Sequence, residues 1–345
     1  MPRFRWVLGV LVLGLAGALV GVVPDGVSAV VARARCRPTV FVANGSSGTV
    51  STIDVKTRVK NPTDITVGST PTGVAVTPEG KTVFVTDDLS NAVSAIDART
   101  RRKHPIDIGV APTAWAVAVT PDGKTVFVTD DISNTVSTID VKTRAKNPTD
   151  ITVGAHPNGV AVTPDGKTAF VTNFGGNSVS TIDVKTRTKD PTDIPVGSVP
   201  GGVAVTPDGK TAFVTNQASG TVSTIDVKTR TKDPTDITVG SLPVGVAVTP
   251  DGKTAFVANN LSDSVSTIDV KTRTKDPTDI AVGSSPVQVA FTPDGKTAFV
   301  TNAGKGVGSE GNSVSTIDVT TRAKNPTDIA VGATPFGVAV APCHR

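Results

Sequence analysis

The chain has 345 residues, a formal net charge of +4, two cysteines, no tyrosine and only 4% aromatic residues. Basic residues are not interleaved with aromatic ones and no base-reading motif is present, which argues against a nucleic-acid-binding protein. Val and Thr fill short runs between Gly and Pro, a pattern that indicates an all-β protein whose core is built from many medium-sized side chains.

Residues 1–29 have the order of a secretory signal peptide. Two arginines precede an apolar run from Trp6 to Val23, and small residues follow up to Ala29. We expect cleavage after Ala29, with Ala34 as the alternative site, so that 30–35 is a short segment before the repeat domain at 36–345. An uncleaved membrane anchor remains an alternative, although the run is close to the lower length limit for a span. The sequence therefore predicts Sec-type export to a secreted or cell-surface location.

From residue 36 onward the chain is an array of repeats. The pentapeptide Val-Ser-Thr-Ile-Asp, or a near copy, occurs seven times, with steps of 43 residues between the first six copies and 49 before the last. The copies end at Asp54, Asp97, Asp140, Asp183, Asp226, Asp269 and Asp318. A period of about 40–45 residues filled with short strands is typical of a β-propeller. We predict one domain, a seven-bladed β-propeller with four-stranded antiparallel blades.

One repeat shows the expected blade. Its strands, from the inner to the outer position, are predicted at 160–162, 169–172, 179–183 and 194–196. A tight hairpin at Pro164-Asp165-Gly166 joins the first two, because Pro fixes φ and Gly tolerates positive φ.

The two ends of the repeat domain complement each other. The first blade starts at its second strand, near Thr39, whereas the chain ends with a spare inner strand at 337–341, so the C-terminal strand should complete the first blade. Cys36 and Cys343 then map to the same missing hairpin, and we predict a disulfide between them. Unpaired or intermolecular thiols are the alternative.

The second strand of each blade carries a recognisable motif. Phe-Val-Thr-Asn occurs at 170–173, 213–216 and 299–302, and variants ending in Asp occur at Asp87 and Asp130. These segments resemble the Tyr-Val-Thr-Asn (YVTN) β-propeller repeat family, with Phe in place of Tyr. The resemblance implies a propeller fold and an exported or surface location, and it implies no particular chemistry.

The loops that join blades and the loops between second and third strands should share one face, which we call the top face; the other turns form the bottom face. Bottom turns are nearly identical between blades, whereas top loops differ. One position per blade, at the start of each inner strand, should form a ring at the channel mouth: Thr72, Trp115, Asn158, Gly201, Val244, Val287 and Phe336.

Several residues at this mouth are candidate ligand contacts. Trp115 and Phe336 could stack on a ligand, Asn158 and Gln288 could orient it, and His156 could exchange a proton. In the alternative interpretation, Trp115 plugs the channel and the other positions have simply drifted.

Metal binding and catalysis have little support in the sequence. The pairs Asp87-Asp88 and Asp130-Asp131 lie in equivalent loops of neighbouring blades and could hold Ca²⁺, although Asp also caps turns. No other cofactor is indicated. His156 is the one candidate catalytic residue, since no arrangement of Ser, His and Asp or of Cys and His suggests a nucleophile.

Two further segments have alternative interpretations. The glycine-rich insertion 303–311 is either a flap over the mouth or a tolerated loop insertion. Lysines and arginines are concentrated in the bottom turns, where they could contact an anionic cell-wall polymer or envelope surface, or form a solvated rim.

These features favour a monomeric, non-catalytic binding or interaction scaffold with its ligand, or a protein partner, at the top face. A lactonase- or lyase-like enzyme that uses the same pocket and a purely structural envelope protein remain the alternatives.

Overall fold

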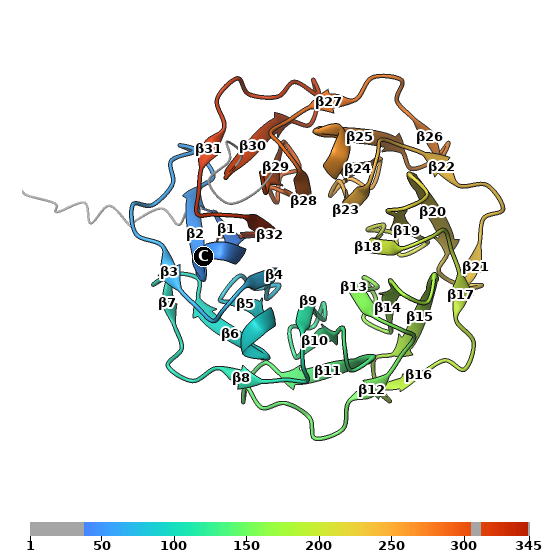
Figure 1. Cartoon of the computed structure of the whole chain (residues 1–345), viewed down its shortest axis with the longest axis horizontal. Helices are drawn as coiled ribbons and strands as arrows, with labels where there is room; N and C mark the ends of the chain where they lie inside the picture. Colours follow the sequence, from blue (N-terminus) through green and yellow to red (C-terminus); the bar gives the residue numbers. More distant parts are fainter. Residues whose placement is uncertain (1–37, 305–311, 344–345) are drawn as a thin grey trace, which may run out of the picture. The chain divides into compact units, whose positions relative to one another are not determined.

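Each repeat folds into one antiparallel sheet, and seven such sheets surround a central axis in the computed structural model (Figure 1). The structure describes residues 38–304 and 312–343. The predicted seven-bladed propeller is confirmed.

The strands occupy equivalent positions in every blade. The inner strands are β32 (Pro335–Ala341), β4 (Pro71–Val76), β9 (Ala114–Val119), β13 (Pro157–Val162), β18 (Pro200–Val205), β23 (Pro243–Val248) and β28 (Pro286–Phe291). The second strands are β1 (Thr39–Asn44), β5 (Thr82–Asp87), β10 (Thr125–Asp130), β14 (Thr168–Asn173), β19 (Thr211–Asn216), β24 (Thr254–Asn259) and β29 (Thr297–Asn302). The third strands are β2 (Thr49–Asp54), β6 (Ala92–Asp97), β11 (Thr135–Asp140), β15 (Ser178–Asp183), β20 (Thr221–Asp226), β25 (Ser264–Asp269) and β30 (Ser313–Asp318).

The outer strands are short pieces: β3 (Ile65–Thr66), β7 (Arg102–Lys103), β8 (Ile108–Gly109), β12 (Ile151–Thr152), β16 (Thr188–Lys189), β17 (Ile194–Pro195), β21 (Thr231–Lys232), β22 (Ile237–Thr238), β26 (Thr274–Lys275), β27 (Ile280–Ala281) and β31 (Ile329–Ala330). Single 3₁₀ turns follow three second strands: η1 (Gly45–Ser47), η2 (Asp88–Ser90) and η3 (Asn260–Ser262). The fourth strand predicted at 194–196 corresponds to β17, and β16 is an additional outer piece: in the blade of β13, both pair with β15. Pro191 lies between these two pieces and has no N–H with which to continue the ladder.

The C-terminal strand closes the ring as predicted. β32 pairs antiparallel with β1, with Thr39 opposite Ala341 and Val42 opposite Val338. Cys36 lies outside the described residues, so the disulfide to Cys343 stays a prediction, supported by this register. Segments 1–29 and 30–35 and the insertion residues 305–311 also lie outside them. No helix in the described ranges is long and apolar enough to cross a membrane.

The core lies between neighbouring blades. One Phe and one Ile per blade are fully buried; Phe170 and Ile182 are the pair in the fourth blade. Phe170 packs with Val203, Ala212 and Ile225 of the next blade, so the ring joins two sheets rather than filling one. Burial of a side chain of this kind contributes about 1.5–3 kcal/mol.

The inner hairpins close by a repeated hydrogen-bond pattern. In the fourth blade, the Thr163 hydroxyl donates to Asp165 at 2.6 Å, and the Gly166 N–H donates to the Thr163 carbonyl at 2.8 Å. Gly166 has φ of +70°, the left-handed conformation for which glycine is suited.

The Thr of the motif joins neighbouring blades near the axis. Thr172 Oγ1 accepts the N–H of Gly159 in its own blade at 2.7 Å and donates to the carbonyl of Gly201 in the next blade at 2.6 Å. The same donation reaches Asn158 from Thr129 and Val244 from Thr215. This contact holds the backbone of the predicted ring positions against the adjacent sheet.

Candidate functional site

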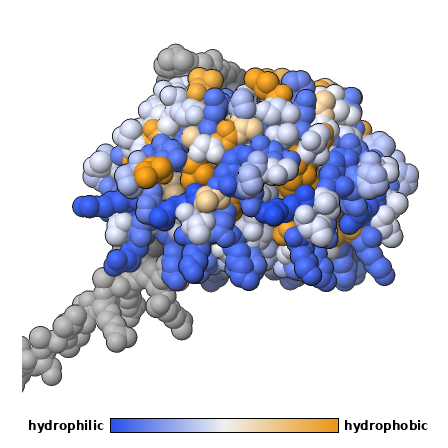
Figure 2. All heavy atoms as spheres, turned by 90° about the horizontal axis from the view of Figure 1, so that it is seen from below, coloured by the Kyte–Doolittle hydropathy of each residue, from blue (hydrophilic) through white to orange (hydrophobic). Residues whose placement is uncertain are grey.

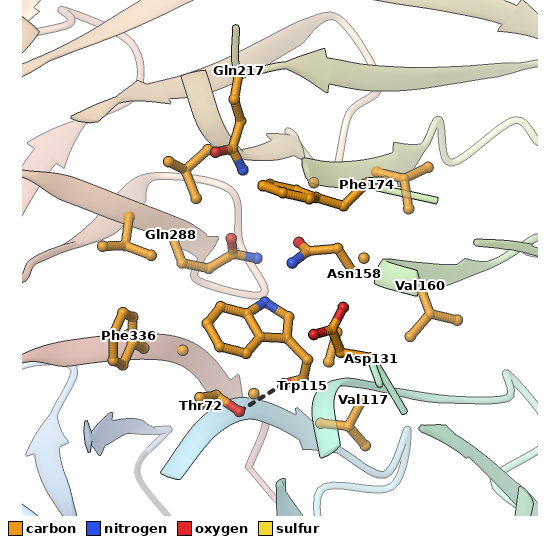
Figure 3. A pocket seen from close by; sticks show the side chains of 18 of the residues that line it. Thr72, Trp115, Val117, Asp131, Asn158, Val160, Phe174, Gln217, Gln288 and Phe336 are labelled. Atoms are coloured by element: carbon orange, nitrogen blue, oxygen red, sulfur yellow. Dashed lines mark hydrogen bonds between the residues drawn. The ribbon is translucent and has the colours of Figure 1, made fainter. Parts of the chain in front are cut away.

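A cavity of 630 Å³, which we call the axial cavity, opens where the inner strands begin (Figure 3). It contains every predicted ligand candidate: Thr72, Trp115, His156, Asn158, Val244, Gln288 and Phe336. This volume lies within the range of about 300–1,000 Å³ that is usual for small-molecule sites. Trp115 is one of the residues that line the cavity.

Aromatic rings from three blades line the axial cavity. The ring centroids of Trp115 and Phe336 are 6.1 Å apart, with the planes inclined by 58°. Phe174, in the loop after β14, is the third. Thr72 is 4% exposed and donates its hydroxyl to the Trp115 carbonyl at 2.7 Å, so it positions the tryptophan backbone.

Amide side chains form the polar part of the lining. Asn158, Gln217 and Gln288 point into the cavity from three blades, and Asn158 comes from the same blade as Phe174 (Figure 3). Their side-chain amides make no hydrogen bond to other groups in the described parts of the chain, whereas the amide of Asn260 donates to the Pro286 carbonyl at 3.3 Å. Three donor and acceptor pairs therefore remain available to a ligand.

Glycines in neighbouring positions make room for these side chains. A Cβ on Gly45 would lie 2.7 Å from the Phe336 ring, and a Cβ on Gly175 would lie 2.7 Å from the His156 ring. A Cβ on Gly201 would collide with the Gln217 amide. Real Cβ atoms do not approach so closely, so each of the three side chains depends on a glycine for its position.

His156 and Asp131 form a polar pair at the cavity mouth. His156 Nδ1 lies 3.2 Å from Asp131 Oδ1, and the side chains are 55% and 30% exposed. The His156 backbone has φ of 54° and its N–H donates to Asn134 Oδ1, which fixes the direction in which the ring leaves the chain. A carboxylate that contacts one imidazole nitrogen leaves the other to face a ligand.

The structure separates the four carboxylates that were candidates for Ca²⁺. Asp87 and Asp130 end second strands and are fully buried inside their blades, where they contact Ser94 and Ser137. Asp88 and Asp131 lie on the top face. Among the residues described, no group of three or more His, Cys, Asp or Glu side chains is placed to hold a metal ion.

Burial raises the pKa of Asp87 from 3.8 to about 6, against a smaller opposing effect of the Ser94 hydrogen bond. The pKa of Asp130 rises to about 7 for the same reasons. Five other blades have Asn at this position, and there the amide donates to the serine; Asn173 to Ser180, at 3.0 Å, is one case. The two aspartates are therefore variants of a structural position.

Positively and negatively charged side chains lie side by side on the bottom face. Hairpin Lys167 lies 3.4 Å from Asp165, and Lys189 in the outer turn lies 2.7 Å from Asp193. Arg230 forms an ion pair with Asp190 of the preceding blade. Figure 2 shows hydrophilic side chains along one face and hydrophobic patches along the opposite one. Carboxylates therefore accompany the predicted ring of cations and offset much of its field.

Sequence reasoning missed part of the lining. Phe174, Gln217, Leu242 and Asn260 all contribute to the axial cavity. Phe174, Gln217, Asn260 and Asp131 occupy one equivalent position, directly after the last residue of the second strand. The residue type at this position changes from blade to blade, and that variability was the signal that could have identified it.

Comparisons with known proteins agree on the fold. The sequence profile of the Virginiamycin B lyase family matches residues 45–340. None of the curated proteins matches the sequence.

Three solved structures are similar to the chain. Hydrazine synthase of Kuenenia stuttgartiensis is 24% identical, with a TM-score of 0.70 over 79% of this chain and 90% of that one. A putative 6-phosphogluconolactonase of Bacteroides uniformis is 16% identical, with a TM-score of 0.75 over 89% and 100%. Virginiamycin B lyase of Staphylococcus aureus is 17% identical, with a TM-score of 0.64 over 77% and 87%. At these identities the likeness shows a shared fold and does not transfer an activity.

Proposed function

The chain belongs to the virginiamycin B lyase family, and from that premise we propose that its axial cavity binds a small organic ligand without converting it. One observation carries this proposal. Three aromatic rings and three unpaired amides, contributed by five of the blades, converge on one cavity in a molecule whose blades are otherwise near copies.

The glycines beside the cavity support the view that its lining has a function and did not arise by random sequence change. Three pocket side chains, Phe336, His156 and Gln217, each occupy space that a methyl group on a neighbouring residue would fill.

We also propose that the protein is exported or held at the cell surface. The order of residues 1–29 and the likeness of the Phe-Val-Thr-Asn segments to the YVTN repeat support this location. Mass spectrometry of the protein secreted by its native host tests it: a mature N-terminus at residue 30 or 35 is expected, and an intact Met1 retained inside the cell would contradict it.

A thermal-shift screen tests the binding function. The purified protein is heated with a panel of amines, alcohols, sugars, short peptides and organic acids. A ligand at 100 times its Kd stabilises the native state by about 2.7 kcal/mol. The double variant N158A/Q288A should lose the shift, whereas D122N, an exposed hairpin carboxyl on the bottom face, should keep it. A panel without any hit would favour a purely structural envelope protein, and shifts that persist in N158A/Q288A would show that the ligand does not bind through these amides.

A lyase is the second candidate, and the His156–Asp131 pair favours it. Asp131 contacts Nδ1 and orients the imidazole, as the neighbouring carboxylate of a histidine general base does. The family also includes virginiamycin B lyase. Incubation with virginiamycin B, followed by mass spectrometry, tests this activity. Consumption that His156→Ala abolishes would establish a lyase; an unchanged compound, or equal consumption by both proteins, would reject this role for His156.

A further inference from the structure

The charged groups that line the axial cavity favour negative potential. Asp131 is the only acidic residue in its described lining, and no Lys or Arg of residues 38–304 or 312–343 contributes to it. A second carboxyl, Asp88, lies on the adjacent blade; desolvation and the charge of Asp131 both raise its pKa. The mouth is therefore a site of negative potential.

The Asp131 carboxylate is only partly engaged by the protein. Its single side-chain partner in the described structure is His156, at 3.2 Å from Oδ1. The side chain is 30% exposed and points into the cavity (Figure 3). Its second oxygen can therefore meet a ligand inside the mouth.

The aromatic rings that line the cavity also favour a positively charged ligand. The faces of Trp, Tyr and Phe rings carry negative partial charge and attract ammonium groups, with Trp the strongest of the three. Trp115 and Phe336 present tilted rings 6.1 Å apart, and Phe174 adds a third. The neutral amides of Asn158, Gln217 and Gln288 can accept hydrogen bonds from N–H groups without adding positive charge.

We propose that the ligand of the axial cavity is an organic cation: an amine or quaternary ammonium group on an apolar body, held by the Asp131 carboxylate and the aromatic rings. This inference rests on the proposed binding function and specifies its ligand class. An anionic ligand would meet Asp131 with no Lys or Arg in the described lining to compensate its charge, and a neutral one would leave the carboxylate unused.

Three probes with one aromatic body isolate the charge. They are N,N,N-trimethyl-2-phenylethylammonium, 2-phenylethanol and phenylacetate, which are cationic, neutral and anionic. The chain has two Trp and no Tyr, so the full-length variant Trp6→Phe leaves Trp115 as its only tryptophan and places the fluorescence signal in the cavity. Titrations at pH 8 in 50 mM salt give the three affinities.

The cation should bind at least tenfold more tightly than 2-phenylethanol, and phenylacetate should be the weakest of the three. Asp131→Asn should lower the affinity for the cation about tenfold and leave 2-phenylethanol unchanged. Asp122→Asn removes the same charge from an exposed hairpin outside the cavity and should leave the affinity for the cation unchanged.

Equal affinities of the cation and the alcohol, or an Asp131→Asn protein that binds the cation as before, would overturn the inference. Either result would leave the proposed binding function intact, because 2-phenylethanol would still report on the cavity. A cation that causes no change in fluorescence or calorimetry overturns the inference as well, and the ligand screen then decides the binding function separately.

Discussion

Replacing Asp87 and Asp130 by Asn should stabilise the protein at pH 8 and remove a pH dependence. Both carboxyls are fully buried, and desolvation raises their pKa values from 3.8 to about 6 and about 7. The native state therefore holds protons that the unfolded chain releases, and stability falls as the pH rises from about 4 to about 7.

The hydrogen-bond geometry leads to the same result. Ser94 Oγ lies 2.6 Å from Asp87 Oδ2 and 3.0 Å from Asp107 Oδ1, and a hydroxyl has only one hydrogen to donate. Both contacts are satisfied when Asp87 is protonated and donates to Ser94, which then donates to Asp107. In the fourth blade the amide of Asn173 supplies this first donor permanently.

Each pKa unit corresponds to roughly 1.4 kcal/mol. The shifts therefore set limits of roughly 3 kcal/mol for Asp87 and roughly 4 kcal/mol for Asp130 on the stability lost between low and high pH. We expect the free energy of unfolding of D87N/D130N to exceed that of the wild type by at least ~2 kcal/mol at pH 8. At pH 4.5, where the two carboxyls are neutral in the native state, the free energies of unfolding should differ little.

Urea unfolding at intervals between pH 4.5 and pH 8 measures the effect. The reverse change, Asn173→Asp, is the matched control; it should introduce the same loss of stability at high pH into a blade that lacks it. The reasoning is refuted if D87N/D130N keeps the pH dependence of the wild type, or is less stable at pH 8.

Three further outcomes follow from the packing. Thr172→Val removes the buried bond to the Gly201 carbonyl between two blades and should lower the free energy of unfolding by about 1–3 kcal/mol in urea titrations; no change would show that this bond contributes nothing. Gly201→Ala displaces the Gln217 amide and should weaken the binding of 2-phenylethanol at least threefold, measured by Trp fluorescence. Gly109→Ala, which has open space around its Cβ, should leave this binding unchanged, and equal effects of the two changes would contradict the role of Gly201. Cys343→Ser should remove the predicted disulfide to Cys36 and cost up to about 5 kcal/mol, so a melting temperature equal to that of the oxidised wild type would exclude the bond.

The sequence predicted the strands of each blade because their determinants are local and repeated. Four strands, a Pro-Asp-Gly turn and one Phe recur at a fixed step, so the expected ranges of 160–162 and 179–183 agree with β13 and β15. The additional outer piece β16 at Thr188–Lys189 was missed, because it is only two residues long and the polar sequence around it has no strand pattern.

The candidate site was predicted in part. The position of Trp115 in the ring follows from register alone, since each blade contributes the same position of its inner strand. Phe174 and Gln217 were missed because they enter the cavity from loops, where the direction of a side chain depends on neighbours about 40 residues away. The proposed pairing of Asp130 with Asp131 in a metal site did not allow for the end of the strand: Asp130, the last residue of β10, is buried inside its blade, whereas Asp131 lies in the turn that follows, on the top face.

The amino-acid sequence by itself determined the number of blades, the order of strands within each and the union of the two chain ends, because each depends on a pattern that recurs at short range. The tertiary structure alone decided which variable side chains meet at the axis, which glycines make room for them and which aspartates hold a proton. Those properties depend on contacts between blades and on exclusion of water, and a residue acquires both only once the ring has closed.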